Sequence, residues 1–247
     1  MKDLKGKTAL ITGAATGVGR ATSLMLAKLG ANIAINYSRS ESDARSLKEN
    51  LDRMGVKSLL CPADVSGDDQ VRKMVRSVVD FFGGVHILVN NAGVTYYVDM
   101  NDLEGMTEEY WDRIMAVNVK GNFFVTRACA PELRKNKGQV VNVASIAGFM
   151  GRGSCIAYAV SKAAIVSLTK AMARVLAPDV TVNAVAPGII NTRWVRGHEE
   201  HVETQSAGTP LKRIAEAEDV AETIAAFVTN AGFVTGQTLV VDGGFTL

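Results

Sequence analysis

Lys7-Thr-Ala-Leu-Ile-Thr12 is followed at once by Gly13-Ala-Ala-Thr-Gly17-Val-Gly19, and an amphipathic stretch then runs from Arg20 to Leu29 before Gly30. The first run has the length and apolar character of a short buried strand, and a glycine after an amphipathic run is typical of a helix end. A strand, a glycine-rich turn and a helix in this order bring backbone N–H groups and a positive helix end up to a phosphate. The pattern Gly-x-x-x-Gly-x-Gly differs from the standard dinucleotide fingerprint Gly-x-Gly-x-x-Gly. A nucleotide-binding turn is therefore the prediction, and a plain tight turn is the alternative.

The same alternation of strand and helix continues along the chain. Seven short apolar runs are predicted as strands, at residues 8–12, 32–37, 58–61, 86–90, 139–144, 181–186 and 238–241. Longer amphipathic runs separate them, among them residues 68–82, 110–129 and 154–176. Such an alternation predicts a parallel sheet with helices on both faces, and right-handed crossovers then give a doubly wound, Rossmann-type α/β fold. We expect a single domain over residues 1–247, in which the irregular residues 191–211 form a cap over the site.

One pair of residues in the predicted helix 154–176 has the spacing that proton transfer needs. Tyr158 and Lys162 stand four residues apart, downstream of Ser145. Side chains at this spacing share one helix face, with Cβ atoms roughly 5–6 Å apart. Because a nearby ammonium favours the charged form of a phenol, Lys162 is expected to lower the pKa of Tyr158 toward neutral pH. A solvated surface pair is the alternative for these two residues taken alone.

The composition excludes several classes of protein. The chain is 47% apolar and 21% charged, with a net charge of +2, which is ordinary for a globular protein and gives no basic field for nucleic acid. No apolar run has the roughly eighteen residues of a membrane span. Because the first residues lead directly into the first predicted strand, we expect no signal peptide. The three cysteines are widely spaced, so reduced thiols in the cytoplasm are expected. No metal site is expected, because His198 and His201 lack a third ligand.

Further motifs follow one another in order along the chain. They are Thr12-Gly-x-x-x-Gly-x-Gly19, Asp64-Val65, Asn90-Asn-Ala-Gly93, Val117-Asn-Val-Lys-Gly121, Ser145 with Tyr158 and Lys162, and Pro187-Gly188 with Thr192. In these motifs and their order, over nearly its whole length, the chain resembles the compact single-domain branch of the short-chain dehydrogenase/reductase family. The resemblance implies an oxidoreductase in which hydride passes between a nicotinamide and a carbonyl carbon.

The resemblance also implies the residues of the site. The catalytic set would be Asn118, Ser145, Tyr158 and Lys162, with Tyr158 as general acid, Ser145 holding the carbonyl oxygen and Asn118 anchoring a water behind Lys162. Besides Tyr158 and Lys162, the residues expected to bind the cofactor are Gly13, Thr16, Gly17, Val18, Gly19, Ser38, Arg39, Ser40, Asp64, Val65, Asn91, Ala92, Gly93, Pro187, Gly188, Ile190 and Thr192.

The end of the second predicted strand bears on the choice of cofactor. Enzymes that use NAD place an acid there for the ribose hydroxyls, whereas enzymes that use NADP place an arginine nearby for the 2′-phosphate. Here the strand continues into Tyr37-Ser-Arg-Ser40, with no carboxylate before Glu41. Arg39, flanked by serines, therefore favours NADP(H) over NAD(H). Thr16 departs from the Arg or Lys that many NADP-linked relatives carry in the turn, although Arg20 follows shortly after it.

The substrate is less constrained by the sequence. The chain is most similar to 3-oxoacyl-[acyl-carrier-protein] reductases, through Asn90-Asn-Ala-Gly-Val-Thr95, Tyr37-Ser-Arg-Ser40 and the ending from Thr235 to Gly244. Reduction of a 3-oxoacyl thioester in fatty acid biosynthesis is the leading prediction. The alternatives are an NAD-dependent sugar, polyol or cyclic-alcohol dehydrogenase and a non-catalytic NADP-binding sensor, and the intact catalytic set argues against the sensor.

Two kinds of partner are expected. An acidic acyl carrier protein would need a basic surface, which Arg127, Arg134, Lys135 and Lys137 could provide, with a solvated helix end as the alternative. The resemblance implies a homotetramer that pairs its long helices, and the alanines of residues 154–176 would permit close packing there. Trp194 could face either the substrate or a partner subunit.

Overall fold

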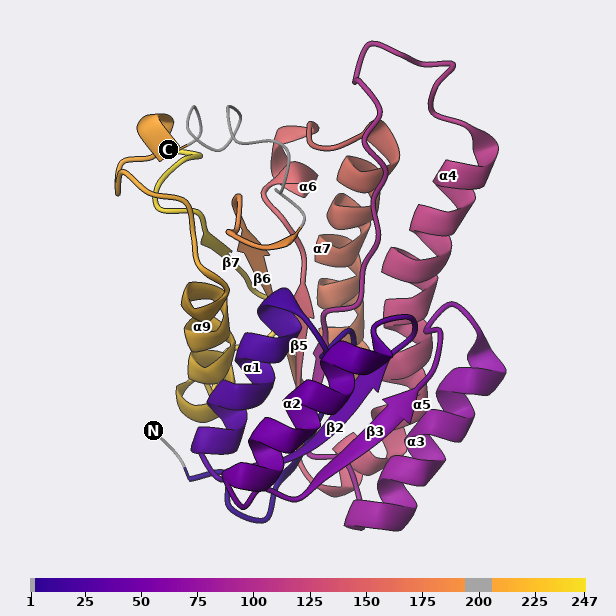
Figure 1. Cartoon of the computed structure of the whole chain (residues 1–247), viewed down its shortest axis with the longest axis vertical. Helices are drawn as coiled ribbons and strands as arrows, with labels where there is room; N and C mark the ends of the chain where they lie inside the picture. Colours follow the sequence, from indigo (N-terminus) through magenta and orange to yellow (C-terminus); the bar gives the residue numbers. More distant parts are fainter. Residues whose placement is uncertain (1–2, 194–205) are drawn as a thin grey trace.

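The computed structural model describes residues 3–193 and 206–247, and within them a single seven-stranded parallel sheet forms the centre of the molecule (Figure 1). The strand order is β3-β2-β1-β4-β5-β6-β7. The strands are β1 (Thr8–Ile11), β2 (Asn32–Tyr37), β3 (Ser58–Pro62), β4 (Ile87–Asn90), β5 (Gln139–Val143), β6 (Thr181–Pro187) and β7 (Thr238–Val241). Every predicted strand is present, with ends that differ by at most one residue, so the predicted doubly wound α/β fold is confirmed.

Helices cover both faces of this sheet. One face carries α1 (Gly17–Lys28), α2 (Glu41–Arg53) and α9 (Ala217–Asn230). The other face carries α3 (Asp68–Phe82), α4 (Glu108–Ile114), η1 (Met115–Gly121), α5 (Asn122–Lys135) and α7 (Ile156–Leu176), and the short α6 (Ala147–Met150) precedes α7. Among the described helices, α7 has the length and apolar composition of a membrane span. It packs into the same core as α3 and α5, as the central helix of a globular fold does.

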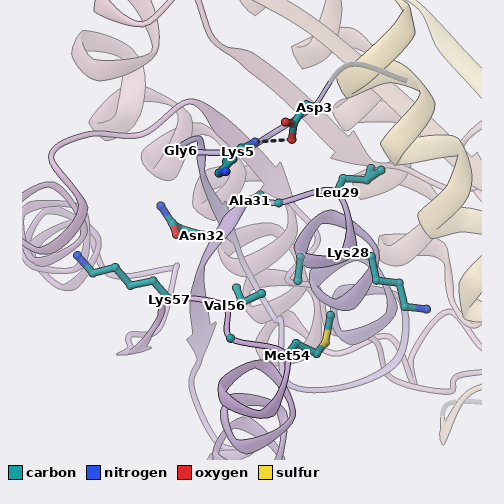
Figure 2. A pocket seen from close by; sticks show the side chains of 13 residues that line it. Asp3, Lys5, Gly6, Lys28, Leu29, Ala31, Asn32, Met54, Val56 and Lys57 are labelled. Carbon is teal, nitrogen blue, oxygen red and sulfur yellow. Dashed lines mark hydrogen bonds between the residues drawn. The ribbon is translucent and has the colours of Figure 1, made fainter.

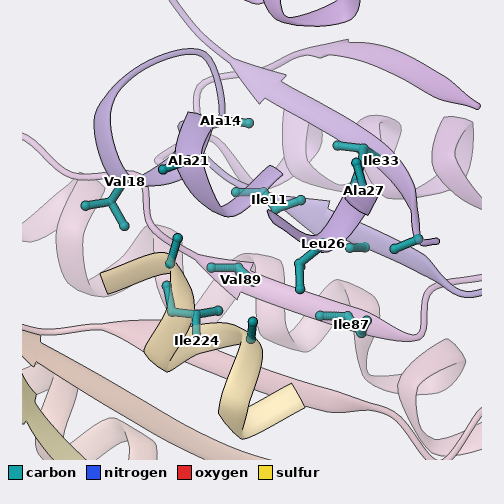
Figure 3. Packing of buried hydrophobic residues seen from close by; sticks show 14 of the residues in the cluster. Ile11, Ala14, Val18, Ala21, Leu26, Ala27, Ile33, Ile87, Val89 and Ile224 are labelled. Atoms are coloured by element: carbon teal, nitrogen blue, oxygen red, sulfur yellow. The ribbon is translucent and has the colours of Figure 1, made fainter. Parts of the chain in front are cut away.

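The alternation of side chains along β1 explains why both faces need cover. Ala9 and Ile11 contribute to the core beneath α1 and α9, whereas Leu10 contributes to the core beneath α3 and α5. Figure 3 shows the first of these cores, where Ile224 of α9 and Leu26 of α1 pack with side chains of the sheet. A strand whose successive side chains are buried on opposite faces reads as a continuous apolar run, which is what the sequence contains.

The predicted helix over residues 110–129 is wrong in one respect. The helical segment begins at Glu108 and ends at Lys135, and residues Met115–Gly121 within it form a π-helix. Hydrophobic periodicity does not register a local change from i→i−4 to i→i−5 hydrogen bonds. Such π segments are rare and are frequently found at functional sites, and this one contains Asn118.

The order of strands also places the site. β1 pairs with β2 on one side and with β4 on the other, so the chain crosses from one half of the sheet to the other at this point. In open α/β sheets, ligands bind outside the carboxyl ends of the strands at such a switch point. The segments that follow β1, β4, β5 and β6 are therefore expected to border the ligand site.

Candidate functional site

The turn after β1 is held in a shape that only glycine permits. Gly13 and Gly17 have φ values of +60° and +51°, and a Cβ on Gly19 would lie 2.3 Å from the carbonyl oxygen of Gly13. α1 begins at Gly17 with no side-chain cap from Thr16 and no acid in its first turn. The first backbone N–H groups of a helix lack intrahelical partners and carry partial positive charge. The turn is therefore a cradle that suits a diphosphate.

The loop after β4 is hydrogen-bonded to this turn. The Oγ1 of Thr12 accepts hydrogen bonds from the backbone N–H groups of Asn91 (2.9 Å) and Ala92 (3.0 Å). In return, the Asn91 amide donates to the carbonyl oxygens of Thr12 (2.9 Å) and Gly13 (3.1 Å). The predicted cofactor residues Asn91 and Ala92 thus lie directly beside the glycine turn, and Gly93 follows them toward Lys162.

A buried asparagine, absent from the predicted site, fixes the turn from the other side. Asn36 of β2 is 1% exposed, and its Oδ1 accepts from the backbone N–H of Gly13 (3.2 Å). Its Nδ2 donates to the carbonyl oxygens of Cys61 (3.0 Å) and Ala63 (3.1 Å). The sequence signal that could have identified Asn36 was a polar residue within an otherwise apolar strand, because a buried amide must find hydrogen-bond partners.

Beyond β2 lie the residues predicted to choose between NAD and NADP. Ser38 and Arg39 are exposed, and Ser40 is half-buried before α2. Within the described part of the chain, the Arg39 guanidinium makes no hydrogen bond or ion pair. Glu41, the first carboxylate after the strand, is paired with Arg45 at 2.6 Å. The loop therefore presents a guanidinium and hydroxyls to a ligand, and its nearest acid is engaged elsewhere.

Asp64, after β3, is held by a partner that the sequence did not reveal. Its Oδ1 accepts from the hydroxyl of Ser66 (2.7 Å), and its Oδ2 accepts from the guanidinium of Arg113 in α4 (2.8 Å). Partial burial by itself raises the pKa of Asp64, but the hydrogen bonds from Ser66 and Arg113 lower the pKa overall. Asp64 is therefore an oriented carboxylate, and the buried Val65 beside it packs against Gly121 of η1.

The three residues Ser145, Tyr158 and Lys162 converge at the ends of β5 and β6. The side chains of Ser145 and Tyr158 are hydrogen-bonded to each other. Ser145 also donates to the carbonyl oxygen of Pro187 (3.4 Å). Lys162 is 4% exposed, and its Nζ donates to the carbonyl oxygen of Val143 (2.8 Å) and lies 5.5 Å from the centre of the Tyr158 ring. The surface-pair alternative for Tyr158 and Lys162 is thereby excluded.

The pKa values of Tyr158 and Lys162 differ from the expectation drawn from the spacing of the two residues. Burial raises the pKa of Tyr158 to about 12, and the hydrogen bond from Ser145 offsets only part of that rise. Burial lowers the pKa of Lys162 to about 8. The expectation that the pKa of Tyr158 is lowered toward neutral pH is therefore wrong. The reason is that removal from water disfavours both the phenolate and the ammonium.

Asn118 is held beside this cluster by the π-helix. Its Oδ1 accepts from the backbone N–H of Val94 (2.8 Å), and its Nδ2 donates to the carbonyl oxygen of Val94 (3.1 Å) and to the Oγ of Ser161 (3.0 Å). Ser161 in turn donates to the carbonyl oxygen of Tyr158 (2.7 Å). A Cβ on Gly93 would lie 3.5 Å from Oδ1 of Asn118 and 3.9 Å from Nζ of Lys162, so the Gly93 backbone lies between the two. Ser161 is a further residue that sequence reasoning missed.

The segment after β6 returns over the glycine turn. The backbone N–H of Gly188 donates to the carbonyl oxygen of Val241 (3.0 Å), and Ile190 forms a bridge with Ala215. A Cβ on Gly17 would meet the methyl carbon of Thr192 at 3.4 Å, so Thr192 lies directly against the turn. The predicted cap continues from here into residues 194–205, and these residues, with Trp194, His198 and His201, lie outside the described part of the chain.

The predicted basic surface has partners within its own chain. Arg127 pairs with Asp68 at 2.5 Å, Lys137 with Asp179 at 3.1 Å and Lys135 with Glu132 at 3.9 Å. Arg134 donates to the carbonyl oxygen of Val175 (2.7 Å). These contacts agree with a solvated helix end, and the end of α5 leads into the amino end of β5, the edge of the sheet opposite Tyr158 in this chain.

A separate depression of about 450 Å³ also lies at that opposite edge (Figure 2). Lys5, Lys28, Asn32 and Lys57 are among the residues that line it. Asn32 begins β2 and Lys57 precedes β3. The depression therefore contains none of the residues that the sequence assigned to the site.

Comparisons with known proteins agree with this geometry. A family model described as Enoyl-(Acyl carrier protein) reductase matches residues 13–246. The chain is 40% identical over 242 residues to the 3-oxoacyl-[acyl-carrier-protein] reductase FabG of Staphylococcus epidermidis, with 96% of this chain and 98% of the relative covered. It is 40% identical over 243 residues to the granaticin polyketide synthase putative ketoacyl reductase 2 of Streptomyces violaceoruber, with 96% and 94% covered.

Solved structures of short-chain dehydrogenases also match nearly the whole chain. A putative short-chain dehydrogenase/reductase from Burkholderia xenovorans superposes with a TM-score of 0.92 at 33% identity, over 97% of this chain and 98% of the other. A short chain dehydrogenase from Burkholderia cenocepacia J2315, solved in complex with NADP, superposes with a TM-score of 0.92 at 33% identity over the full length of both chains.

Proposed function

Because the chain belongs to the short-chain dehydrogenase/reductase family, whose members are oxidoreductases of alcohol and carbonyl groups, we propose that it reduces a 3-oxoacyl thioester to the 3-hydroxyacyl form with NADPH. The observation that carries the proposal is the hydrogen-bonded pair of Ser145 and Tyr158 with the buried Lys162 behind it. This cluster and the glycine turn lie at the same edge of the sheet, beyond the carboxyl ends of its strands.

The residues of the turn fit a dinucleotide. The close approach of Gly19 to Gly13 leaves no room for a side chain, and the start of α1 has neither a cap nor an acid to compete with a phosphate. Gly13, Thr16, Gly17, Val18 and Gly19 would hold the diphosphate. The further residues proposed to bind the cofactor are Asp64, Val65, Asn91, Ala92, Gly93, Tyr158, Lys162, Pro187, Gly188, Ile190 and Thr192. Ser38, Arg39 and Ser40 would bind the 2′-phosphate.

The protein's own part in the reaction is to hold the carbonyl and to supply a proton. A bound nicotinamide supplies the hydride for the carbonyl carbon. Ser145 donates a hydrogen bond to the substrate oxygen, and Tyr158 transfers its phenolic proton to that oxygen as the general acid. A phenol with a pKa near 12 is fully protonated at neutral pH, which is the form that the reductive direction requires. Lys162 and a water anchored at Asn118 would return the proton to Tyr158.

The choice of an acyl thioester as the substrate rests on the names of the similar proteins. Two of them are named for the reduction of 3-oxoacyl or ketoacyl groups. An acyl carrier protein is the proposed source of the thioester, although the basic side chains near the end of α5 are already paired with groups of their own chain. A cytoplasmic location, a homotetramer and a single domain with a cap over residues 191–211 belong to the same proposal.

The test follows the absorbance of NADPH, and of NADH in a parallel reaction, with a short 3-oxoacyl thioester as substrate. We expect rapid oxidation of NADPH and slow oxidation of NADH. Reduction of NAD+ by a polyol or cyclic alcohol, seen as a rise in absorbance, without turnover of the thioester, would replace the proposal with the NAD-dependent dehydrogenase alternative.

A further inference from the structure

Arg193 joins two parts of the candidate site that lie far apart in the sequence. Its Nη1 donates to the Oγ of Ser40 at 3.3 Å, across 153 residues of chain. The same nitrogen lies 3.9 Å from Oδ2 of Asp43 in α2. The preceding residue, Thr192, lies against Gly17 of the glycine turn. The segment after β6 therefore runs from the diphosphate cradle to the loop between β2 and α2.

The contacts of Arg193 with α2 are of a kind that a ligand can replace. The side chains of Arg193 and Asp43 are 50% and 51% exposed, and exposed ion pairs at such distances are weak. The neighbouring carboxylate of Glu41 is occupied by Arg45 at 2.6 Å. A phosphate dianion carries more charge than the Asp43 carboxylate, and it can bind a guanidinium through two parallel hydrogen bonds.

We propose that Arg193 is a second guanidinium ligand of the cofactor's 2′-phosphate, opposite Arg39, and that it helps to set the preference for NADPH over NADH. The inference rests on the proposed use of NADPH. Arg39 has no partner among the described residues, and Ser40, to which Arg193 already donates, stands beside it. A phosphate at Ser40 would therefore meet a guanidinium from each of two separate segments.

The position of Arg193 has a consequence for the other end of the cofactor. Thr192 and Arg193 are adjacent, so a phosphate that holds Arg193 also holds Thr192 against the glycine turn. NADH lacks the phosphate and would leave Arg193 with its weak contacts to Ser40 and Asp43. Binding of the two cofactors should therefore differ by more than the contribution of Arg39 alone.

The experiment measures the dissociation constants of NADPH, NADH and 2′-AMP by calorimetry for the wild type and for Arg193→Gln, Arg193→Lys and Arg39→Gln. Since a hydrogen bond to a charged group is worth about ten- to a hundredfold in affinity, Arg193→Gln should weaken NADPH and 2′-AMP by about that factor. The same variant should change NADH by less than about threefold, and Arg193→Lys should recover part of the loss. Asp43→Asn, which removes the competing carboxylate, should tighten NADPH a few-fold.

Arg72→Gln serves as the matched control, because Arg72 also pairs with an acid at the start of a helix, Asp68, but in α3 and not in α2. Thermal unfolding of each variant verifies that it is folded. An unchanged affinity of Arg193→Gln for NADPH, or an equal loss for NADPH and NADH, would overturn the role of Arg193. If the wild type itself binds NADPH and NADH equally, the proposed use of NADPH fails first. If Arg39→Gln abolishes the preference and Arg193→Gln preserves it, only the second guanidinium is refuted.

Discussion

Nζ of Lys162 lies 5.5 Å from the centre of the Tyr158 ring and donates to the carbonyl oxygen of Val143 at 2.8 Å. The lysine is therefore held by the end of β5, while its ammonium lies within cation–π distance of the Tyr158 ring. The side chain of Ser145 is hydrogen-bonded to that of Tyr158. This division of contacts separates the proton donor from the charge that supports it.

Removal of the Tyr158 hydroxyl should abolish most turnover and leave cofactor binding largely intact. A general acid contributes roughly 10²–10⁴-fold to a rate, so Tyr158→Phe should lower kcat by that factor. Tyr110→Phe is the control, because Tyr110 stacks on Tyr96 at 4.0 Å outside the catalytic set. Retention of more than about a hundredth of the activity by Tyr158→Phe would show that another group supplies the proton.

The buried Lys162 should make stability depend on pH in a particular direction. Its pKa is about 8 in the folded protein, below the ordinary value of 10.5 that applies to the unfolded chain, so between these values the unfolded chain binds more protons and stability rises with pH. Lys162→Met abolishes this dependence. The stability of the variant relative to the wild type should therefore fall by about 2–3 kcal/mol between pH 7 and pH 10.

Urea unfolding of both proteins at the two pH values measures this difference, and effects of other titrating groups cancel in the comparison. A difference that stays constant across the window would mean that Lys162 keeps its ordinary pKa when buried.

Ser161 should act on the reaction through the residues that it connects. Its Oγ accepts from Asn118 and donates to the carbonyl oxygen of Tyr158, so Ser161→Ala leaves the buried Asn118 amide short of a partner. A loss of this kind costs about 1–3 kcal/mol of stability. Ser167→Ala, at an exposed position of the same helix, is the matched control.

A purely structural role of Ser161 would lower stability alone. We expect in addition a lower kcat with little change in KM, and a shift in the pH profile of kcat, because the contact positions Asn118 beside Lys162. Full activity of a folded Ser161→Ala protein would contradict this expectation.

A side chain at Gly19 should destroy the cradle without straining the backbone. Gly19 lacks the positive φ of Gly13 and Gly17, so the obstacle is the carbonyl oxygen of Gly13 at 2.3 Å from the added Cβ. Gly19→Ala should weaken binding of both NADPH and NADH by at least about tenfold, since overpacking of this kind costs about 1–3 kcal/mol or forces the turn to move. At Gly208 an added Cβ would meet only Phe245 at 3.7 Å, so Gly208→Ala should bind both cofactors normally in a fluorescence titration.

The pattern of residues along the chain was sufficient for the fold, because strands and helices of this type depend on short-range periodicity. The apolar run before Gly13 and the alternation that follows it predicted all seven strands, and the model confirms each of them. The spacing of Tyr158 and Lys162 likewise placed both on one helix, since a separation of four residues is a local property. The roles of these residues stay predictions.

Only the tertiary structure determined the environment of the site, because burial and long-range partners have no signature in local spacing. The sequence predicted that Lys162 lowers the pKa of Tyr158, whereas enclosure by distant strands and loops raises it. The bonds of Asn36 to the glycine turn and of Arg193 to Ser40 cross 23 and 153 residues. Such contacts arise when separate strands end at the same edge of the sheet, and the free energy of each polar group then depends on which segments happen to enclose it.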